Sequence, residues 1–126
     1  MENSLEKIKN HVEFLGYECE LDDDVLSIKK EDTSILIRKL SYAVIHTSFW
    51  KINKNIDDNL YKIINSTNTN SVIALHRINE EQSSLVIEAF YAGEYSKITY
   101  AKFLEAFIKD DDDQLLDNKE LLEYLK

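Results

Sequence analysis

The sequence contains no proline, two glycines and a single cysteine in 126 residues. One cysteine excludes a disulfide within the chain, so nothing points to an oxidising compartment. The two glycines, Gly16 and Gly93, stand alone, which excludes the glycine-rich loops that cradle phosphates. With so few turn formers, no flexible linker divides the chain. These absences predict one domain, residues 1–126, in the cytoplasm.

Long hydrophobic runs and clustered basic residues are also missing. No apolar run approaches the roughly 20 residues that a membrane helix needs. Only 15 residues are Lys or Arg against 24 Asp or Glu, which gives a net charge of −9. Such a chain repels phosphate backbones and anionic lipids, so we expect neither nucleic acid nor membrane as a partner. Hydrophobic residues make up 44%, which is enough for a core.

The residue patterns of known catalytic and metal sites are absent as well. There is no G-x-S-x-G, C-x-x-C or H-E-x-x-H motif. His46 and His76 lie in different predicted strands and could meet, but too few further ligands remain for zinc; His11 is most simply a boundary residue of the first helix. Cys19 lies between Glu18 and Glu20, whose charges raise the pKa of a thiol. We therefore predict no catalytic residue, no metal and no cofactor.

Two aspartate runs invite a calcium interpretation. Asp110–Asp113 fits no register of an EF-hand loop, because position six is never glycine. Like charges also repel along a helix, so the run predicts a solvated acidic loop. Asp22–Asp24 predicts a hairpin turn, since aspartate tolerates the backbone angles of tight turns.

Apolar residues at three- and four-residue steps predict the helices. A first helix carries Leu5, Ile8, Val12 and Leu15 and ends at Gly16. A second has Asn55 as its N-cap and ends in the polar segment 65–70. A third begins at Ser96 or Thr99. A short terminal helix carries the leucines between 115 and 125. The apolar positions of the second and third helices are Ile56, Leu60, Ile63, Ile64, Thr67, Tyr100, Phe103, Leu104, Phe107 and Ile108.

Runs of β-branched and aromatic residues predict five strands, at 25–28, 34–38, 42–50, 72–78 and 85–91. The first three are joined by connections too short for parallel crossovers, so they form an antiparallel meander. Gly93 follows the last strand. The predicted order is α-β-β-β-α-β-β-α(-α), an α+β fold with a five-stranded antiparallel sheet and helices on one face.

One face of this sheet suggests binding. If Ile45 and Phe49 face the helices, a mixed apolar and polar row faces outward, which is typical of an interface. Alternatively, both faces are partly covered, or the inward face is the opposite one. The predicted partner-binding residues are Leu36, Val44, His46, Trp50, Val86 and Phe90.

Almost the whole chain resembles the YbjN family, within the type III secretion chaperone-like (CesT/Tir chaperone) superfamily. The resemblance lies in element order and hydrophobic pattern. It is carried by the first helix ending in L-G-Y-E, the Asp22–Asp24 turn, the meander from Ile35 to Trp50, the helix L-Y-K-I-I-N and the closing F-L-E-A-F helix.

This resemblance implies a small, often dimeric domain without catalysis. Secretion chaperones of this fold bind extended segments of partner proteins, and YbjN-like members are described as sensory or regulatory. We thus expect a noncatalytic, protein-binding or chaperone-like regulatory domain that acts as a homodimer, with an extended client segment as a further partner. The alternatives are a small-ligand sensor with a pocket between sheet and helices, and an enzyme with a cleft of titratable groups.

Overall fold

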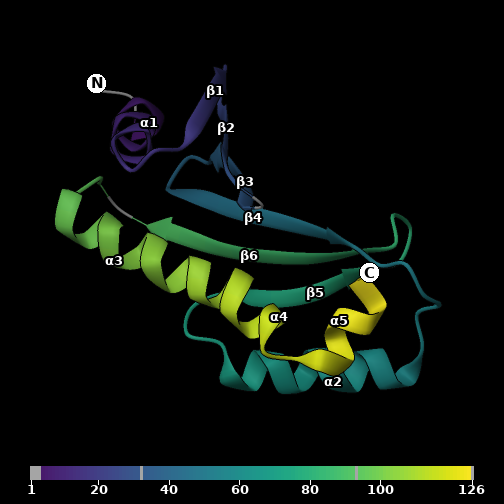
Figure 1. The fold of residues 1–126 in the computed structure, drawn as a ribbon. Helices are drawn as coiled ribbons and strands as arrows, with labels where there is room; N and C mark the ends of the chain where they lie inside the picture. Colours follow the sequence, from purple (N-terminus) through teal and green to yellow (C-terminus); the bar gives the residue numbers. More distant parts are fainter. Residues whose placement is uncertain (1–3, 32, 93, 126) are drawn as a thin grey trace. The chain divides into compact units, whose positions relative to one another are not determined.

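In the computed structural model, residues 4–31, 33–92 and 94–125 are described, so Gly93 lies outside them. Helices and strands alternate in the order α-β-β-β-β-α-β-β-α, followed by short C-terminal helices (Figure 1). The elements are α1 (Ser4–Phe14), β1 (Glu18–Asp22), β2 (Val25–Lys30), β3 (Thr33–Lys39), β4 (Ala43–Lys51), α2 (Asp58–Asn70), β5 (Leu75–Asn79), β6 (Ser84–Ala92), α3 (Lys97–Ile108), the π-helix η1 (Lys109–Asp113), α4 (Gln114–Leu116) and α5 (Lys119–Leu125). Within this described part, no helix has the length and apolar character needed to cross a bilayer.

The sheet has six antiparallel strands in the order β1-β2-β3-β4-β6-β5, one more than predicted. The additional strand, β1, pairs with β2 from Glu18↔Lys29 to Asp22↔Val25. Its alternation of acidic residues with Cys19 and Leu21 has the period of a strand, but acidic residues are poor strand formers. The turn between β1 and β2 is as predicted, with Asp23 at a φ of 51°. A hairpin turn requires a strand on each side, which was the available signal for β1.

Contacts along the chain group the residues into two compact units. Unit 1 comprises Met1–Thr47 and Phe90–Leu104, and unit 2 comprises Ser48–Ala89 and Glu105–Lys126. The strands β4 and β6 and the helix α3 contribute residues to both units. The expectation of a single domain stays a prediction.

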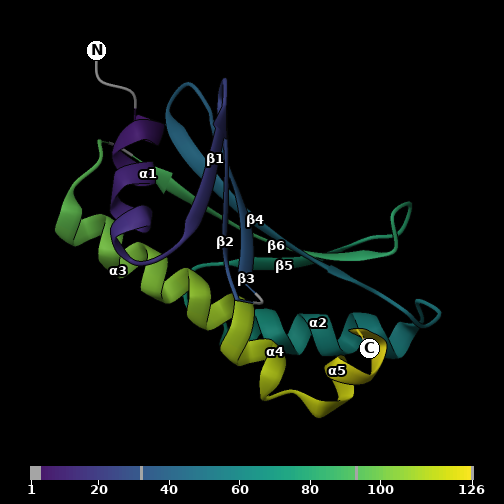
Figure 2. The ribbon, with the colours of Figure 1, turned by 45° about the horizontal axis from the view of Figure 1, so that its top comes forward.

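In unit 1, α1 packs on β1, β2 and β3 (Figure 2). Its predicted apolar stripe is buried at Leu5, Ile8 and Val12, whereas Leu15 is exposed. The helix ends as predicted at Gly16, whose φ is 97°, and the Tyr17 N–H donates to the Val12 carbonyl across this end.

In unit 2, α2 packs against β5 and α5. The predicted inward positions Leu60, Ile63, Ile64 and Thr67 are buried. The N-cap is Asp57 and not Asn55, because the Asp57 carboxylate accepts the Leu60 N–H at 2.9 Å. The helix continues to Asn70, and hydroxyl and amide side chains in its last turns bond to carbonyls four residues earlier.

The identity of this cap gives a direct test. Asp57→Ala is expected to lower the free energy of unfolding by about 1 kcal/mol, the usual value of a side-chain N-cap. Asn55→Ala is the matched control and should leave that free energy unchanged. Urea unfolding of both variants decides between the two caps. Equal losses would contradict the assignment.

Candidate functional site

The aspartate run expected to be a solvated loop instead forms the π-helix η1, and two of its aspartates are fully buried. Asp110 accepts the backbone N–H groups of Val72, Ile73 and Ala74 at 2.7, 2.7 and 2.8 Å. The prediction of a solvated loop was therefore wrong. Burial of this carboxylate is tolerated because three donors replace its hydration.

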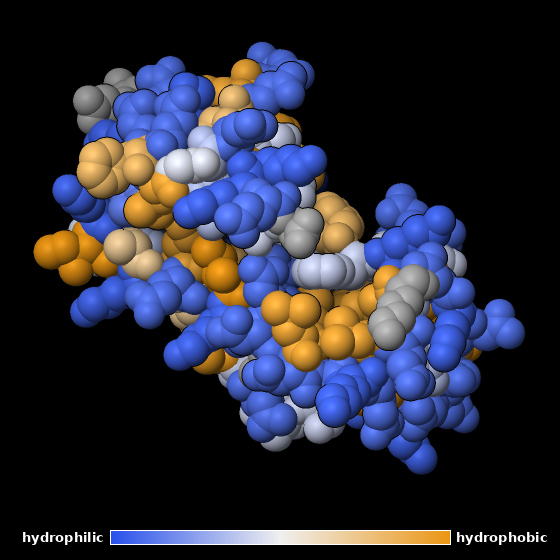
Figure 3. Space-filling view, in the orientation of Figure 1, coloured by the Kyte–Doolittle hydropathy of each residue, from blue (hydrophilic) through white to orange (hydrophobic). Residues whose placement is uncertain are grey.

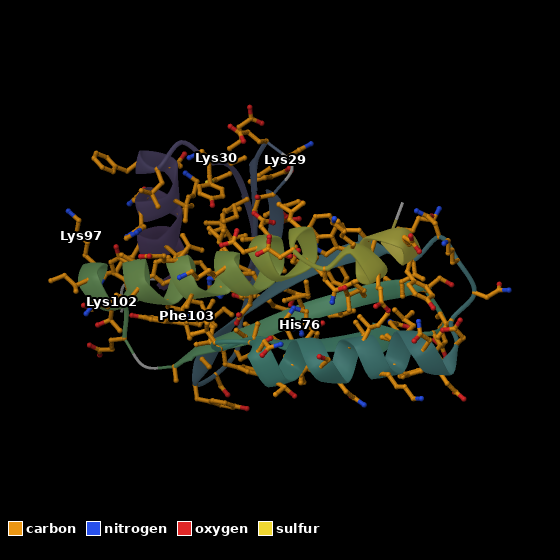
Figure 4. All side chains as sticks on the ribbon, turned by 60° about the horizontal axis from the view of Figure 1, so that its bottom comes forward. Lys29, Lys30, His76, Lys97, Lys102 and Phe103 are labelled. Atoms are coloured by element: carbon orange, nitrogen blue, oxygen red, sulfur yellow. The ribbon has the colours of Figure 1, made fainter. Side chains whose placement is uncertain are left out.

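These bonds also explain why β5 begins at Leu75 and not at the predicted residue 72. The N–H groups of residues 72–74 bond to a side chain and are not available to a neighbouring strand. His76, the second residue of β5, is held by Asn68 of α2. The Asn68 side-chain NH₂ donates to the His76 carbonyl, and the Asn68 side-chain oxygen accepts the His76 N–H. The side chain of His76, which is labelled in Figure 4, donates from Nε2 to the Asp110 carbonyl at 3.0 Å. At this edge of the sheet, the backbone of His76 is thus paired with α2 and its side chain with η1.

Asp111, the next residue, faces a different environment. Its Oδ1 accepts the indole N–H of Trp50 at 2.7 Å, whereas Oδ2 is buried and accepts no well-formed hydrogen bond from any described residue. Burial raises the pKa of Asp111 to about 6, although Trp50 and the Ser48 hydroxyl favour the ionised form. A buried, incompletely paired carboxyl in a π-helix has the character of a functional position.

In unit 1, His46 lies at the centre of an aromatic cluster. It is fully buried, and burial lowers its pKa to about 3, so the ring is neutral. His46 Nε2 and the Tyr100 hydroxyl share a hydrogen bond at 2.6 Å, and the centroids of the Phe103 and His46 rings lie 4.8 Å apart. Tyr91 packs edge-on against the same two aromatic residues of α3. The cluster is a packed part of the core.

The structure places the six predicted partner-binding residues on opposite faces of the sheet. Three of them face inward in β4, which corrects the prediction: His46 bonds to α3, Trp50 bonds to η1, and Val44 is buried on the same side. The prediction that Ile45 and Phe49 face the helices was therefore wrong. Apolar residues occur at both odd and even positions of β4, so the sequence does not show which set of alternate residues faces inward. Leu36, Val86 and Phe90 do lie on the outer face.

Unit 2 exposes apolar side chains on that outer face. Phe49 of β4 and Leu75 of β5 are each 53% exposed, and Val86 of β6, between these strands, is only 1% exposed. Arg77 lies opposite Val86 and forms an ion pair with Glu88 at 3.0 Å. We call these five residues the open face of unit 2. In unit 1, the outer face carries Phe90, which is 56% exposed.

A second apolar area lies over the C-terminal segment that carries α4 and α5 (Figure 3). Leu116 of α4 is exposed, whereas Leu115 and Leu121 are buried. A short terminal helix was predicted for this segment. Some of its leucines pack against the rest of unit 2, and others face solvent.

Unit 2 also has an open polar cleft of about 840 Å³ at the end of β4. Tyr124 of α5 donates its hydroxyl to the Asp57 carboxylate at 2.8 Å, and Lys54 lies near the Tyr124 ring. The Leu60 N–H and the Tyr124 hydroxyl hold the pKa of Asp57 below its ordinary value. The other lining groups are Lys51, Ile52, Asn53, Asn55, Asn59, Ser83, Glu120 and Glu123.

The other two residues that the sequence analysis considered for chemistry, Cys19 and His11, lie among residues of the fold. Cys19 is half-buried, and burial followed by the charge of Glu13 raises the pKa of its thiol. Glu18 and Glu20 are not the cause, because strand alternation turns them to the other face. His11 bonds to the Tyr95 hydroxyl. Among the described residues, no group of three or more His, Cys, Asp or Glu could hold a metal ion.

Sequence reasoning missed Asp110, Asp111 and Asn68. Four consecutive aspartates predict a solvent-exposed segment. The only contrary signal was their position between two apolar helical stretches, 100–108 and 115–125. Such a position keeps the segment against the core. Which aspartates turn inward depends on donors far away in the chain.

No protein-family profile matches the chain, and no curated protein does. Among solved structures, the chain is similar to YbjN of E. coli, which is described as a candidate transcription regulator. The TM-score is 0.72 with 12% sequence identity, covering 91% of this chain and 90% of that chain. At this identity the likeness shows the fold alone. The chain therefore has the α+β fold of YbjN, the type III secretion chaperone-like fold that the resemblance implied.

Proposed function

We propose that this protein is a noncatalytic, protein-binding regulatory domain of the cytoplasm that associates with a second copy through the open face of unit 2. The observation that supports it most is the exposure of Phe49 and Leu75 on a sheet face, where a solvated sheet presents polar groups. The cytoplasmic location is supported by the lone cysteine.

The charges of this face favour a second copy as the occupant. A two-fold interface brings the same patch of both chains together, so the patch must be complementary to itself. The open face carries both members of one ion pair, Arg77 and Glu88. Two copies can exchange these partners while Phe49 and Leu75 leave water. The regulatory part of the proposal rests on the fold shared with YbjN.

The double variant Phe49→Ser/Leu75→Ser tests this interface. Together the two truncations remove about 2–6 kcal/mol of association energy, so we expect dimerisation at least about 30-fold weaker. Light scattering should report a dimer for the wild type at micromolar concentration and one chain for the variant. Phe14→Ser is the matched control, because Phe14 is 89% exposed and belongs to α1 of unit 1, not to the open face of unit 2. A wild-type mass of one chain would overturn the homodimer.

Salt dependence separates a second copy from a basic client. Each chain carries a net charge of −9, so two copies repel one another at long range, and salt screens this repulsion. Self-association is therefore expected to strengthen as salt is raised. Weakening by salt would instead indicate a basic partner on this surface.

The polar cleft of unit 2 favours a second function, a sensor of a small polar ligand. Its volume is in the range of ligand sites, and charged and hydroxyl groups converge on it. It lies at the end of β4 and is not enclosed between sheet and helices. A thermal-shift screen of small polar metabolites tests it: a stabilising compound should lose its effect in Tyr124→Phe and keep it in Tyr61→Phe. A shift that survives Tyr124→Phe would contradict binding in this cleft.

A further inference from the structure

The two buried aspartates of η1 differ in how well they are paired. Asp110 accepts three backbone N–H groups. Asp111 is equally inaccessible to solvent, but the groups on its carboxyl are neutral: the Trp50 indole bonds to Oδ1, the Ser48 hydroxyl also favours the ionised form, and Oδ2 accepts no well-formed hydrogen bond from a described residue. A buried carboxylate in this state bears an uncompensated charge, whereas a buried carboxylic acid does not.

Among the described residues, the groups that act most strongly on the Asp111 carboxyl are neutral or negative. From β4 it faces the Ser48 hydroxyl and the Trp50 indole, which are both neutral. From η1 itself, Asp112 adds a repelling negative charge. From β5, His76 bonds to the Asp110 carbonyl, and burial lowers the pKa of this imidazole. The surroundings thus favour a proton on Asp111.

The backbone at this point is also suited to movement. Residues 109–113 form a π-helix between α3 and α4. Wide turns of this kind are rare, have poor packing along the helix axis and occur mostly where function requires them. Opening η1 would break the interactions of Asp111 with Trp50 and Ser48 of β4, and the bonds of Asp110 would still hold the segment to residues 72–74.

We propose that η1 is a proton-operated latch on Trp50: with a proton on Asp111 the segment is closed over the indole, and loss of that proton loosens it and exposes the indole to water. A protonated Asp111 keeps its acceptor for Trp50 and places a neutral O–H in the buried space. An ionised Asp111 is repelled by Asp112 and is drawn toward solvent. The latch does not depend on the proposed dimer.

The chain contains a single tryptophan, so the fluorescence of Trp50 reports the latch directly. In the wild type, we expect the emission maximum to shift to longer wavelength as pH is raised through the pKa of Asp111, about 6. Asp111→Asn is neutral at every pH and should remove this transition. Asp113→Asn changes an exposed aspartate of the same segment and should leave the midpoint unchanged.

Asp112→Asn provides a test that does not require altering Asp111 itself. It removes a charge that raises the pKa of Asp111, so the fluorescence midpoint should move to lower pH. Hydrogen exchange of residues 109–113, compared with Asp111→Asn at the same pH, should increase above the midpoint. Constant Trp50 emission across this pH range would overturn the latch, and so would a transition that persists in folded Asp111→Asn.

Discussion

Replacing Asp110 by alanine is expected to lower the free energy of unfolding by about 3–5 kcal/mol, because three backbone donors lose their acceptor at once. The variant leaves the N–H groups of residues 72–74 without their acceptor. Each unsatisfied buried donor costs about 1–3 kcal/mol, and water entering the site recovers part of this. Urea unfolding measures the loss.

Two further variants make this prediction specific. Asp110→Asn retains one side-chain oxygen as an acceptor, so its loss should be smaller than that of alanine. Asp113→Ala alters an exposed aspartate in the same π-helix and should change stability by less than about 0.5 kcal/mol. If Asp110→Ala is as mild as Asp113→Ala, η1 does not hold residues 72–74.

A second large effect is expected from His46 as the pH is lowered. In the folded protein the pKa of His46 is about 3, whereas in an unfolded chain it is close to the ordinary value of 6.5. Below pH 6.5 the unfolded state therefore binds a proton that the folded state does not, and stability falls until the pH reaches the folded pKa. Each pH unit in this window costs up to about 1.4 kcal/mol.

The variant His46→Gln isolates this effect because glutamine does not titrate. Its free energy of unfolding, measured in urea at several pH values, should change less with pH than that of the wild type. Taking the difference between the two proteins removes the contribution of Asp111. That contribution has the opposite sign: the pKa of Asp111 is raised from 3.8 to about 6, so stability falls as pH rises through this window. A parallel pH dependence in both proteins would contradict a neutral His46 in the core.

The tests of the dimer and of the latch fail in distinguishable ways. Phe49→Ser/Leu75→Ser alters association through the open face and is read by mass. Asp111→Asn alters Trp50 emission and is read within one chain. A monomeric protein whose Trp50 emission changes with pH would contradict the homodimer alone. A dimer whose Trp50 emission stays constant would contradict the latch alone.

The sequence by itself determined most of the secondary structure. Local patterns were sufficient for α1 and its end at Gly16, for the strands β2–β4 and β6, and for the aspartate turn, because periodicity and turn preference are properties of neighbouring residues. The net charge of −9 and the lack of glycine-rich or metal-binding motifs also follow from the sequence without knowledge of the fold.

The tertiary structure decided which side of each element is inside. The β4 residues 43–46 are all buried, so composition could not tell whether His46 or Ile45 faces the helices; only the Tyr100 hydroxyl and the aromatic rings of α3 distinguish them. In the same way, Asp110 and Asp111 became buried because donors 36 to 61 residues away satisfy them. Long-range hydrogen bonds leave no trace in a local pattern, and they determine where polar groups can lie in the interior of this protein.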